Sequence, residues 1–291
     1  MKSKKIFITY GTKKFRLQKK HIINLAENSN FFDYCIPYAP KDLSLSFVNR
    51  HKNILDQKKG GGFWIWKYQI IKQTIDNLDM NDIVVYSDSG SSLNVNGQKR
   101  YLEYIDMLQS SNHSTLRFKL EHLEKFWTTK EIFNFFELER NSSFGNSNQF
   151  LAGHMLMKKT ESLLEQLEMF NSLIEFDNQL ITNKFDENQI EGFVENRNDQ
   201  SIFSLISKIY GSIEIDNEVW FRNNIESQYN YPFLAVQQSN YSNWEKVKFY
   251  SNYQKHIGST IFFGEKIYSY QKPSILKKII FKLKKFIQKN N

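Results

Sequence analysis

The sequence of 291 residues contains a single cysteine, Cys35. One cysteine cannot form a disulfide within the chain, and no four cysteines and histidines have the spacing of a structural zinc site. A fold held together by disulfides within the chain and a fold built around a structural zinc site are therefore both excluded. The low cysteine content is compatible with a reducing cytoplasm.

Long apolar runs are also lacking. No stretch approaches the roughly 18 apolar residues of a transmembrane helix, and the apolar run after the basic start MKSKK is too short for a signal peptide. Only four prolines punctuate the chain, which has no repeat, Gly/Ser linker or low-complexity tract. With 40% hydrophobic residues, residues 1–272 are expected to form one domain with a sizeable core.

The net charge is +8, and much of it lies at the two ends of the chain. In residues 273–291 apolar side chains recur at helical spacing, and lysines fill most of the positions between them. This pattern predicts a basic amphipathic helix, which either packs on the body or lies on an anionic membrane surface. A nucleic-acid-binding tail is disfavoured, because the apolar stripe would have no role there.

Segments rich in β-branched and aromatic residues alternate with segments of helical periodicity. Strands are predicted over residues 5–11, 31–38 and 82–86, and helices over 17–28 and 63–78. The alternation predicts a single α/β domain of Rossmann-like type with a mostly parallel central sheet. In such sheets ligands gather at the carboxyl ends of the strands.

The stretch DIVVYSDSG places Asp88 just beyond the carboxyl end of a buried strand. There a carboxylate can reach solvent and ligand without the cost of full burial. Two interpretations are open: a functional carboxylate, or a simple turn, since Ser-Asp-Ser-Gly is ordinary turn composition.

Four segments occur in a fixed order: GGGFWIWKYQII, DIVVYSDSG, QFLAGHMLMKKT and ENRNDQSIFSLISK. Together they resemble a group of bacterial and viral sugar transferases with a GT-A fold. The pattern of that group is roughly Gly-x-Trp-x-Trp-Lys, Tyr-x-Asp-x-Gly, a strand near Ala-Gly, and Arg-x-Asp-Gln-Ser. The resemblance covers about residues 5–215, and its specificity lies in the joint occurrence of the motifs.

The resemblance implies transfer of a sugar from a nucleotide-sugar donor to an acceptor. In many GT-A enzymes the strand-end motif is Asp-x-Asp, which holds a divalent cation against the donor diphosphate. This sequence keeps Asp88 but has Gly90 at the second acidic position. The implied cofactor is Mn²⁺ or Mg²⁺ held by Asp88, with His256 as a further candidate ligand, and metal dependence stays open. The alternative for His256 is a structural histidine.

Without a firmly held metal, cationic side chains must neutralise the leaving diphosphate. Lys67 and Arg197 are the basic residues in the two best motifs, and Lys67 is the preferred donor contact. The glycines at 60–62 either let backbone amides approach a phosphate or form only a turn. The alternative for Lys67 is a solvated lysine on a helix.

In the resembling group the RNDQS segment, which contains Asp199 and Gln200, lines the reaction centre. Asp199 is expected to pair functionally with Asp88. It would act as general base in an inverting reaction, or stabilise an oxocarbenium-like centre in a retaining one, and the sequence decides neither. The alternative is that Asp199 or Ser201 caps the following helix.

Two further groups of contacts complete the expected site. Gln149, Ala152 and Gly153 resemble the strand edge that contacts the sugar or acceptor. Tyr10 and Gly11 end the first strand at the same sheet edge, where Tyr10 is expected to stack on the base of the donor. Gln200 and Gly90 are included among the donor-binding residues.

We therefore expect a cytoplasmic glycosyltransferase that builds a surface glycan such as capsule or lipopolysaccharide, peripheral at the inner face of the cell membrane. Its partners would be a nucleotide sugar, a glycan or lipid-linked glycan acceptor and, through residues 273–291, an anionic membrane surface. Nucleic acid is not an expected partner. The alternative is a binding protein that keeps the fold but has lost turnover, because Gly90 replaces the second acid.

Overall fold

The structure is a computed structural model that describes residues 3–219 and 230–235. Its strands are β1 Lys5–Tyr10, β2 Tyr34–Tyr38, β3 Ile83–Ser87, β4 Ser92–Leu93, β5 Thr115–Leu123, β6 Asn148–Phe150, β7 His154–Lys158, β8 Ile213–Ile215 and β9 Phe233–Leu234. Its helices are α1 Arg16–Asn28, α2 Leu45–Arg50, α3 Lys52–Leu55, α4 Gly60–Phe63, α5 Trp66–Asp76, α6 Gln98–Ser110, α7 Lys130–Phe135, α8 Glu161–Phe176 and α9 Asp199–Ile209. His256 and the amphipathic helix predicted over 273–291 lie outside the described residues.

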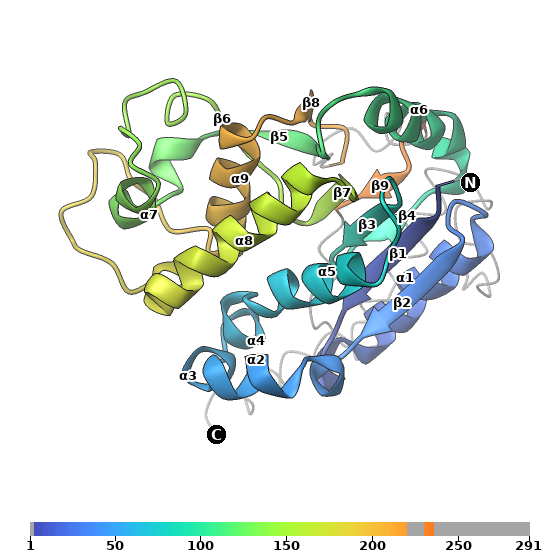
Figure 1. The fold of residues 1–291 in the computed structure, drawn as a ribbon, viewed down its shortest axis with the longest axis horizontal. Helices are drawn as coiled ribbons and strands as arrows, with labels where there is room; N and C mark the ends of the chain where they lie inside the picture. The colour runs from blue at the N-terminus through green and yellow to red at the C-terminus, as the bar shows by residue number, and fades with distance from the viewer. Residues whose placement is uncertain (1–2, 220–229, 236–291) are drawn as a thin grey trace, which may run out of the picture.

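A seven-stranded sheet forms the centre of the described part, in the order β2-β1-β3-β7-β5-β6 with β8 beside β5 (Figure 1). β1 pairs in parallel with β2 and β3, and β5 pairs in parallel with β8. β7 runs antiparallel to both β3 and β5, and β6 runs antiparallel to β5. The predicted α/β fold with a mixed, mostly parallel sheet is confirmed.

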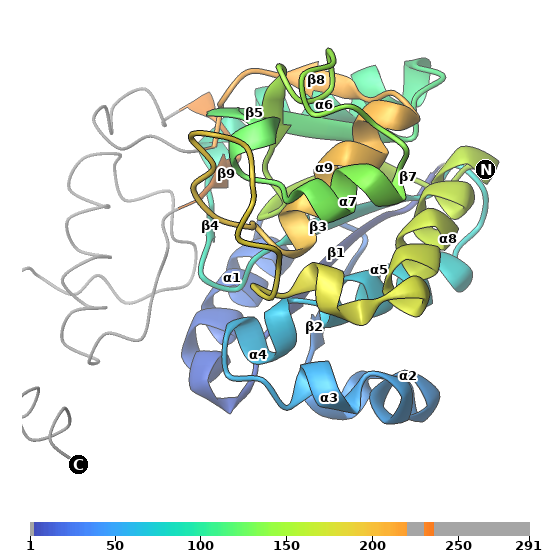
Figure 2. The same cartoon turned by 90° about the vertical axis from the view of Figure 1, so that its left-hand side faces the viewer.

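Helices cover both faces of this sheet (Figures 1 and 2). Alternate residues of β1 point to opposite faces, as a strand requires. Ile6 and Ile8 pack in one hydrophobic core with residues of α5, α8 and α9. Phe7 packs in a second core with residues of α1 and α6. All five residues of β3 are buried, so the expectation of a strand covered on both faces is confirmed.

Two predicted elements begin later in the chain than expected. β2 begins at Tyr34 instead of Phe31, because Asn30 adopts a left-handed turn conformation and Phe31 stacks on Tyr101 at a ring distance of 4.5 Å. α5 begins at Trp66 instead of Phe63, because the backbone before it is left-handed. The apolar side predicted for this helix is buried as expected, at Trp66, Ile70, Ile71 and Ile75.

The backbone before α5 is left-handed over five consecutive residues, Gly60 to Trp64, with φ between 49° and 100°. Glycine relieves the strain at the first three. A Cβ on Gly62 would lie 2.7 Å from the backbone of Leu55, so this position also has no room for a side chain. Phe63 and Trp64 carry the remaining strain, of the order of 1 kcal/mol or more each. The segment therefore fixes the residue at which α5 begins, and with it the position of Lys67.

Within the described residues, no helix combines the length and the apolar character that crossing a membrane requires.

Candidate active site

Three elements bring charged side chains to one point at the carboxyl end of β3. Asp88 follows β3, and its backbone N–H donates to the carbonyl of Gly153 before β7 at 2.9 Å. Lys67 lies in the first turn of α5, and Asp199 is the first residue of α9. The three predicted residues of strongest expected function therefore meet in space, although 111 positions separate Asp88 from Asp199 (199 − 88).

The Lys67 ammonium lies between the two carboxylates. Its Nζ is 2.6 Å from Asp199 Oδ2 and 3.5 Å from Asp88 Oδ1. It also donates to the carbonyl of Ala152 at 3.0 Å and lies 4.9 Å from the centre of the Tyr86 ring. Lys67 is only 2% exposed. The solvated-lysine alternative is therefore wrong, and Lys67 is a buried counter-ion to both acids.

Burial and charge act in opposite directions at this buried pair. Burial alone would lower the pKa of Lys67, but Asp199 and Asp88 outweigh it and keep that pKa above its usual value. Burial raises the pKa of Asp199 to about 6, against the lowering effect of Lys67. Near neutral pH the ionised form of Asp199 therefore predominates, paired with the Lys67 ammonium.

Asp88 keeps access to solvent. Its side chain is 42% exposed, while Oδ1 accepts a 2.5 Å hydrogen bond from the Tyr86 hydroxyl. Oδ2 faces Gly153, where a Cβ would approach it to 3.2 Å. The backbone carbonyl of Asp88 accepts from the N–H of Ser91 at 2.9 Å, so the residue also opens the turn that its composition suggested. Gly90 lies inside that turn.

Tyr86 is a functional candidate that the sequence analysis did not name. Residues two apart on a strand share a face, and Tyr86 stands two positions before Asp88. That spacing was the available signal. Burial raises the pKa of the Tyr86 phenol, and Asp88 raises it further, so the hydroxyl stays a donor.

Tyr10 and Gly11 end β1 at the same edge of the sheet. The Tyr10 ring is 5% exposed and stacks on the Trp66 indole at 3.8 Å with planes 17° apart. One face of the ring is therefore packed inside the protein and cannot stack on a base. The backbone N–H of Gly11 donates to the Tyr38 carbonyl at 3.1 Å, which holds the end of β1 beside β2.

Arg197 lies just before α9 with its guanidinium over the Trp127 ring, 4.4 Å from the centre. Its NH1 is 2.9 Å from Glu195, and its side chain is 38% exposed. Its backbone N–H donates to the Ser201 hydroxyl at 3.1 Å. Asp199 does not cap the helix, because its carboxylate faces Lys67 and Asn198 occupies the cap position.

Hydrogen bonds join Gln149, Gln200 and Ala152, of which Ala152 contacts Lys67, and Gln149 is fully buried. Gln200 Nε2 donates to Gln149 Oε1 at 2.7 Å, and Gln200 Oε1 accepts from the N–H of Ala152 at 3.1 Å. The expected contact of Gln149 with sugar is not possible in this conformation, because its side chain faces the interior. Its partner there is Glu124, a residue that no local pattern in the sequence signals.

Few side chains among residues 3–219 and 230–235 are placed to bind a metal ion. No group of three or more His, Cys, Asp or Glu side chains is close enough there to surround an ion. His154 is buried and hydrogen-bonded through Nδ1 to Ser87 at 2.8 Å, and burial lowers its pKa to about 4. In the described part of the chain, the half-exposed carboxylate at this strand end is that of Asp88. This fits Mg²⁺-type sites, in which one or two carboxylates act with substrate phosphates.

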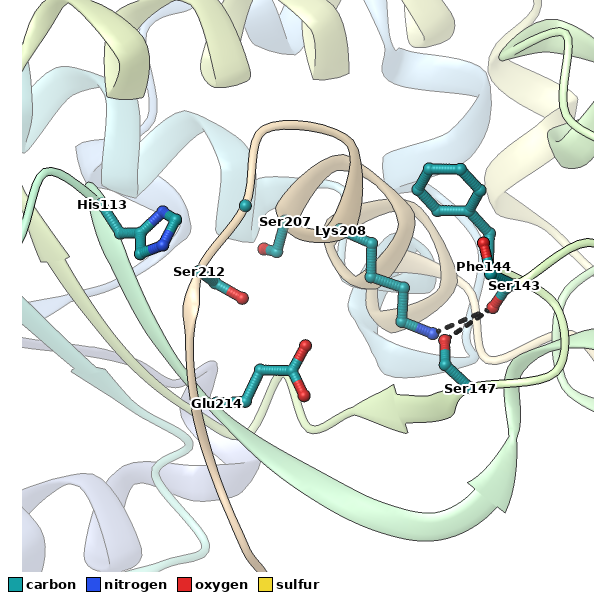
Figure 3. Close-up of a pocket in the computed structure, with 9 residues that line it drawn as sticks. His113, Ser143, Phe144, Ser147, Ser207, Lys208, Ser212 and Glu214 are labelled. Atoms are coloured by element: carbon teal, nitrogen blue, oxygen red, sulfur yellow. Dashed lines mark hydrogen bonds between the residues drawn. The ribbon is translucent and has the colours of Figure 1, made fainter.

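A cavity of about 240 Å³ lies elsewhere, at the other end of α9. Its lining includes His113, Phe144, Ser207, Lys208, Ser212 and Glu214 (Figure 3). A second cavity, of about 300 Å³, is lined by residues of α2, α5 and α8, among them His51 and Glu175. Neither includes a predicted site residue. We place the candidate active site at Asp88, because the strand ends and the ion pairs converge there.

The arrangement of the sheet and helices is that of the GT-A type of glycosyltransferase fold. The chain is similar to the crystal structure of a glycosyltransferase involved in the glycosylation of the major capsid of PBCV-1, with a TM-score of 0.51 and 12% identity over 87% of this chain and 98% of that chain. It is also similar to the apo structure of the bifunctional glycosyltransferase WbbM, with a TM-score of 0.49 and 13% identity over 89% of this chain and 50% of that one. No protein-family model and no curated protein matches the sequence. The similarity to the first of these structures, at 12% identity, shows a common fold and nothing further.

Proposed function

We propose that this protein transfers a sugar from a nucleotide-sugar donor to a glycan acceptor. The observation that carries the proposal is the ion triad at the strand edge, in which the half-exposed Asp88 and the buried Asp199 share Lys67. Ligands of open α/β sheets bind at such carboxyl edges. The GT-A-type fold and the glycosyltransferases that share it support the same reaction class.

In this proposal Asp88 is the residue that faces the donor. A divalent cation, when bound, would be held by Asp88 and would neutralise charge on the leaving diphosphate. The Tyr86 hydroxyl and the Lys67 ammonium hold the Asp88 carboxylate through Oδ1 and leave Oδ2 on the side of Gly153. Arg197, which is partly exposed, is the second cation available for the donor.

Asp199 acts in this proposal mainly through charge. It is 4% exposed and pairs with Lys67 at 2.6 Å. Its charge therefore contributes to the electrostatic field at Asp88. Buried, preorganised charge of this kind stabilises a transition state more than it strengthens substrate binding. Both stereochemical courses, inverting and retaining, are compatible with this role.

The proposal is tested by a screen for donor hydrolysis and transfer against common nucleotide sugars, with and without Mn²⁺. We expect turnover of at least one donor and its near-complete loss in Asp88→Asn. Turnover that survives in that variant at the wild-type level would overturn the assignment of the site.

A second candidate function is a nucleotide-sugar-binding or glycan-binding protein without turnover. Gly90 favours it, because glycine offers no side-chain ligand for a cation at the position where many GT-A enzymes carry a second acid. Calorimetric titration with the same nucleotide sugars separates the two functions. Binding of a donor without any hydrolysis or transfer would support the second candidate.

We further propose that the transferase works at an anionic membrane surface, which the basic sequence of residues 273–291 supports, and that it contributes to a surface glycan. Lysines near such a surface contribute on the order of 1 kcal/mol each. Truncation after Lys272 should then release the protein from anionic vesicles at low salt and leave activity on a soluble acceptor intact. Unchanged sedimentation with vesicles after truncation would contradict this part.

A further inference from the structure

A fully buried carboxylate, Glu124, lies at the C-terminal end of β5 with four side-chain donors around it. Oε1 accepts from Thr128 Oγ1 at 2.6 Å and from Gln149 Nε2 at 2.8 Å. Oε2 accepts from Lys208 Nζ at 2.7 Å and from the Ser204 hydroxyl. The candidate active site does not contain Glu124, although a buried charge with this many partners is costly to build.

Glu124 begins a series of hydrogen bonds with one direction. An ionised carboxylate only accepts hydrogen bonds, so Gln149 must turn its NH₂ group toward Glu124. Gln149 then presents its carbonyl oxygen to Gln200, and Gln200 must donate its NH₂ group in turn. The carbonyl oxygen of Gln200 is left for the backbone N–H of Ala152. We call Glu124, Gln149 and Gln200 the relay.

The relay ends at the ion triad. Ala152, whose N–H is held by Gln200, offers its carbonyl oxygen to Lys67 Nζ at 3.0 Å. The Ala152 carbonyl is therefore the uncharged partner of the Lys67 ammonium, whose other two partners are the carboxylates of Asp88 and Asp199. Gln200 directly follows Asp199 in α9, so the relay holds both the start of that helix and the Lys67 carbonyl partner.

We propose that Glu124 is a positioning residue, which fixes the direction of both glutamine amides and thereby holds Ala152 and the start of α9 against Lys67. The catalytic consequence rests on the proposed transferase function, whereas the direction of the relay does not. In the relay Gln149 contacts only protein, and this replaces its expected role as a sugar contact.

Reversal of the relay tests its direction. Gln200→Glu introduces a carboxylate that cannot donate to Gln149 Oε1, so this variant should melt at a lower temperature at pH 8. Glu124→Gln restores the match, because the new amide can donate to Gln149, which can then turn and donate to the carboxylate at position 200. The double variant should recover at least about half of the summed loss in melting temperature, a non-additivity typical of residues in one network.

The cycle is run in wild type and also in a Lys208→Met background. In that background Glu124→Gln does not leave a buried ammonium without its carboxylate, so the double variant is checked for folding there. Glu124 itself has no counter-ion in that background, so the cycle is read in wild type. Strict additivity of the two substitutions in wild type would show that Gln149 transmits no direction, and the proposal would fail. This measurement needs no substrate, so it holds or fails independently of the transferase assignment.

The catalytic part is read from kinetics with the donor found in the hydrolysis screen. Gln200→Glu should lower kcat about tenfold or more at pH 8 while the donor KM changes less, and Glu124→Gln should partly restore kcat in the double variant. The matched control is Gln189→Glu, which places a carboxylate opposite Glu131, the acceptor of the Gln189 amide at 3.0 Å. It should lower stability and leave kcat unchanged. A kcat that falls equally in the control would overturn the positioning role.

Discussion

Asp88 and Asp199 are two carboxylates that share one lysine in two different surroundings. Asp88 stands at the end of a strand, and 42% of its side chain is exposed. Asp199 stands at the start of a helix, and 5% of its side chain is exposed. The tighter of the two ion pairs is the buried one, at 2.6 Å against 3.5 Å. Lys67 therefore links an interior charge to a charge at the surface.

The different exposure of Asp88 and Asp199 implies different roles for the two acids. A half-exposed carboxylate can exchange its protein partners for a ligand at a low cost in free energy. A buried carboxylate cannot leave its counter-ion without a large cost, because it would remain as an unpaired buried charge. We infer that Asp88 meets the donor and that Asp199 keeps Lys67 charged and in place. Substitutions at the three positions should then lower activity alike and differ in their effect on stability.

The largest effect on stability is expected for Lys67→Met, which removes the shared partner. Two carboxylates would remain near each other, one of them buried, and breaking a buried pair costs about 3–5 kcal/mol. Urea unfolding measures the loss, and donor turnover should vanish as well. Lys72→Met on the same helix is the matched control, because its pair with Asp76 is partly exposed and such i,i+4 pairs contribute about 0.3–0.5 kcal/mol. Similar losses in both variants would remove the distinction between buried and surface charge.

A smaller effect, and one that depends on pH, is expected for Asp199→Asn. The pKa of Asp199 is raised to about 6 in the folded protein, above its unfolded value. Its contribution to stability is therefore fully present below the unfolded pKa and is lost as the pH rises through about 6. The stability of wild type relative to Asp199→Asn should decline between about pH 4 and pH 6. Urea unfolding across this range measures it, and a constant difference would contradict the burial of a titrating Asp199.

The enzymatic activity of Asp199→Asn provides a second test of the different roles of Asp88 and Asp199. Asp199→Asn should lower kcat by about 100-fold or more and change donor binding much less, since it removes charge that acts in the transition state. Titration calorimetry with the donor gives the binding constant for wild type and variant. Equal losses in kcat and in donor affinity would assign Asp199 to binding.

The sequence predicted the positions of the three charges better than their surroundings. Asp88 could be placed because the buried run before it and the turn residues after it are local signals. α9 could be placed for the same reason, since its apolar periodicity is continuous. The burial of Lys67 could not be predicted, because its surroundings on α5 look like an ordinary helix and its partners come from β3 and α9.

Glu124 shows why the rest of the site was not predictable. It lies in the mixed polar and apolar stretch KLEHLEKFW, which gives no local sign of a buried acid, and its partners lie 25 positions away at Gln149 and 84 away at Lys208. A strand was expected at β7, but its antiparallel direction could not be predicted for a related reason: β7 pairs with β3 on one side and with β5 on the other, and such distant pairing sets the direction of a strand. The left-handed backbone at 60–64 was signalled only by its three glycines, which fit several turns equally well.

The smallest effect on stability is expected for Asp88→Asn. The amide keeps the shape of the side chain and can still accept the Tyr86 hydroxyl, and the carboxylate it replaces is already half solvated. The free energy of unfolding should therefore stay within about 1 kcal/mol of wild type. Transfer should nevertheless be nearly abolished, because the neutral amide neither holds a cation nor balances Lys67 at the edge where the donor is expected. Asp76→Asn is the matched control: it is 48% exposed, it pairs with Lys72 of the same helix as Lys67, and it should change neither quantity. A large loss of stability in Asp88→Asn would mean that this acid is as structural as Asp199, and the division of roles between the two carboxylates would be wrong.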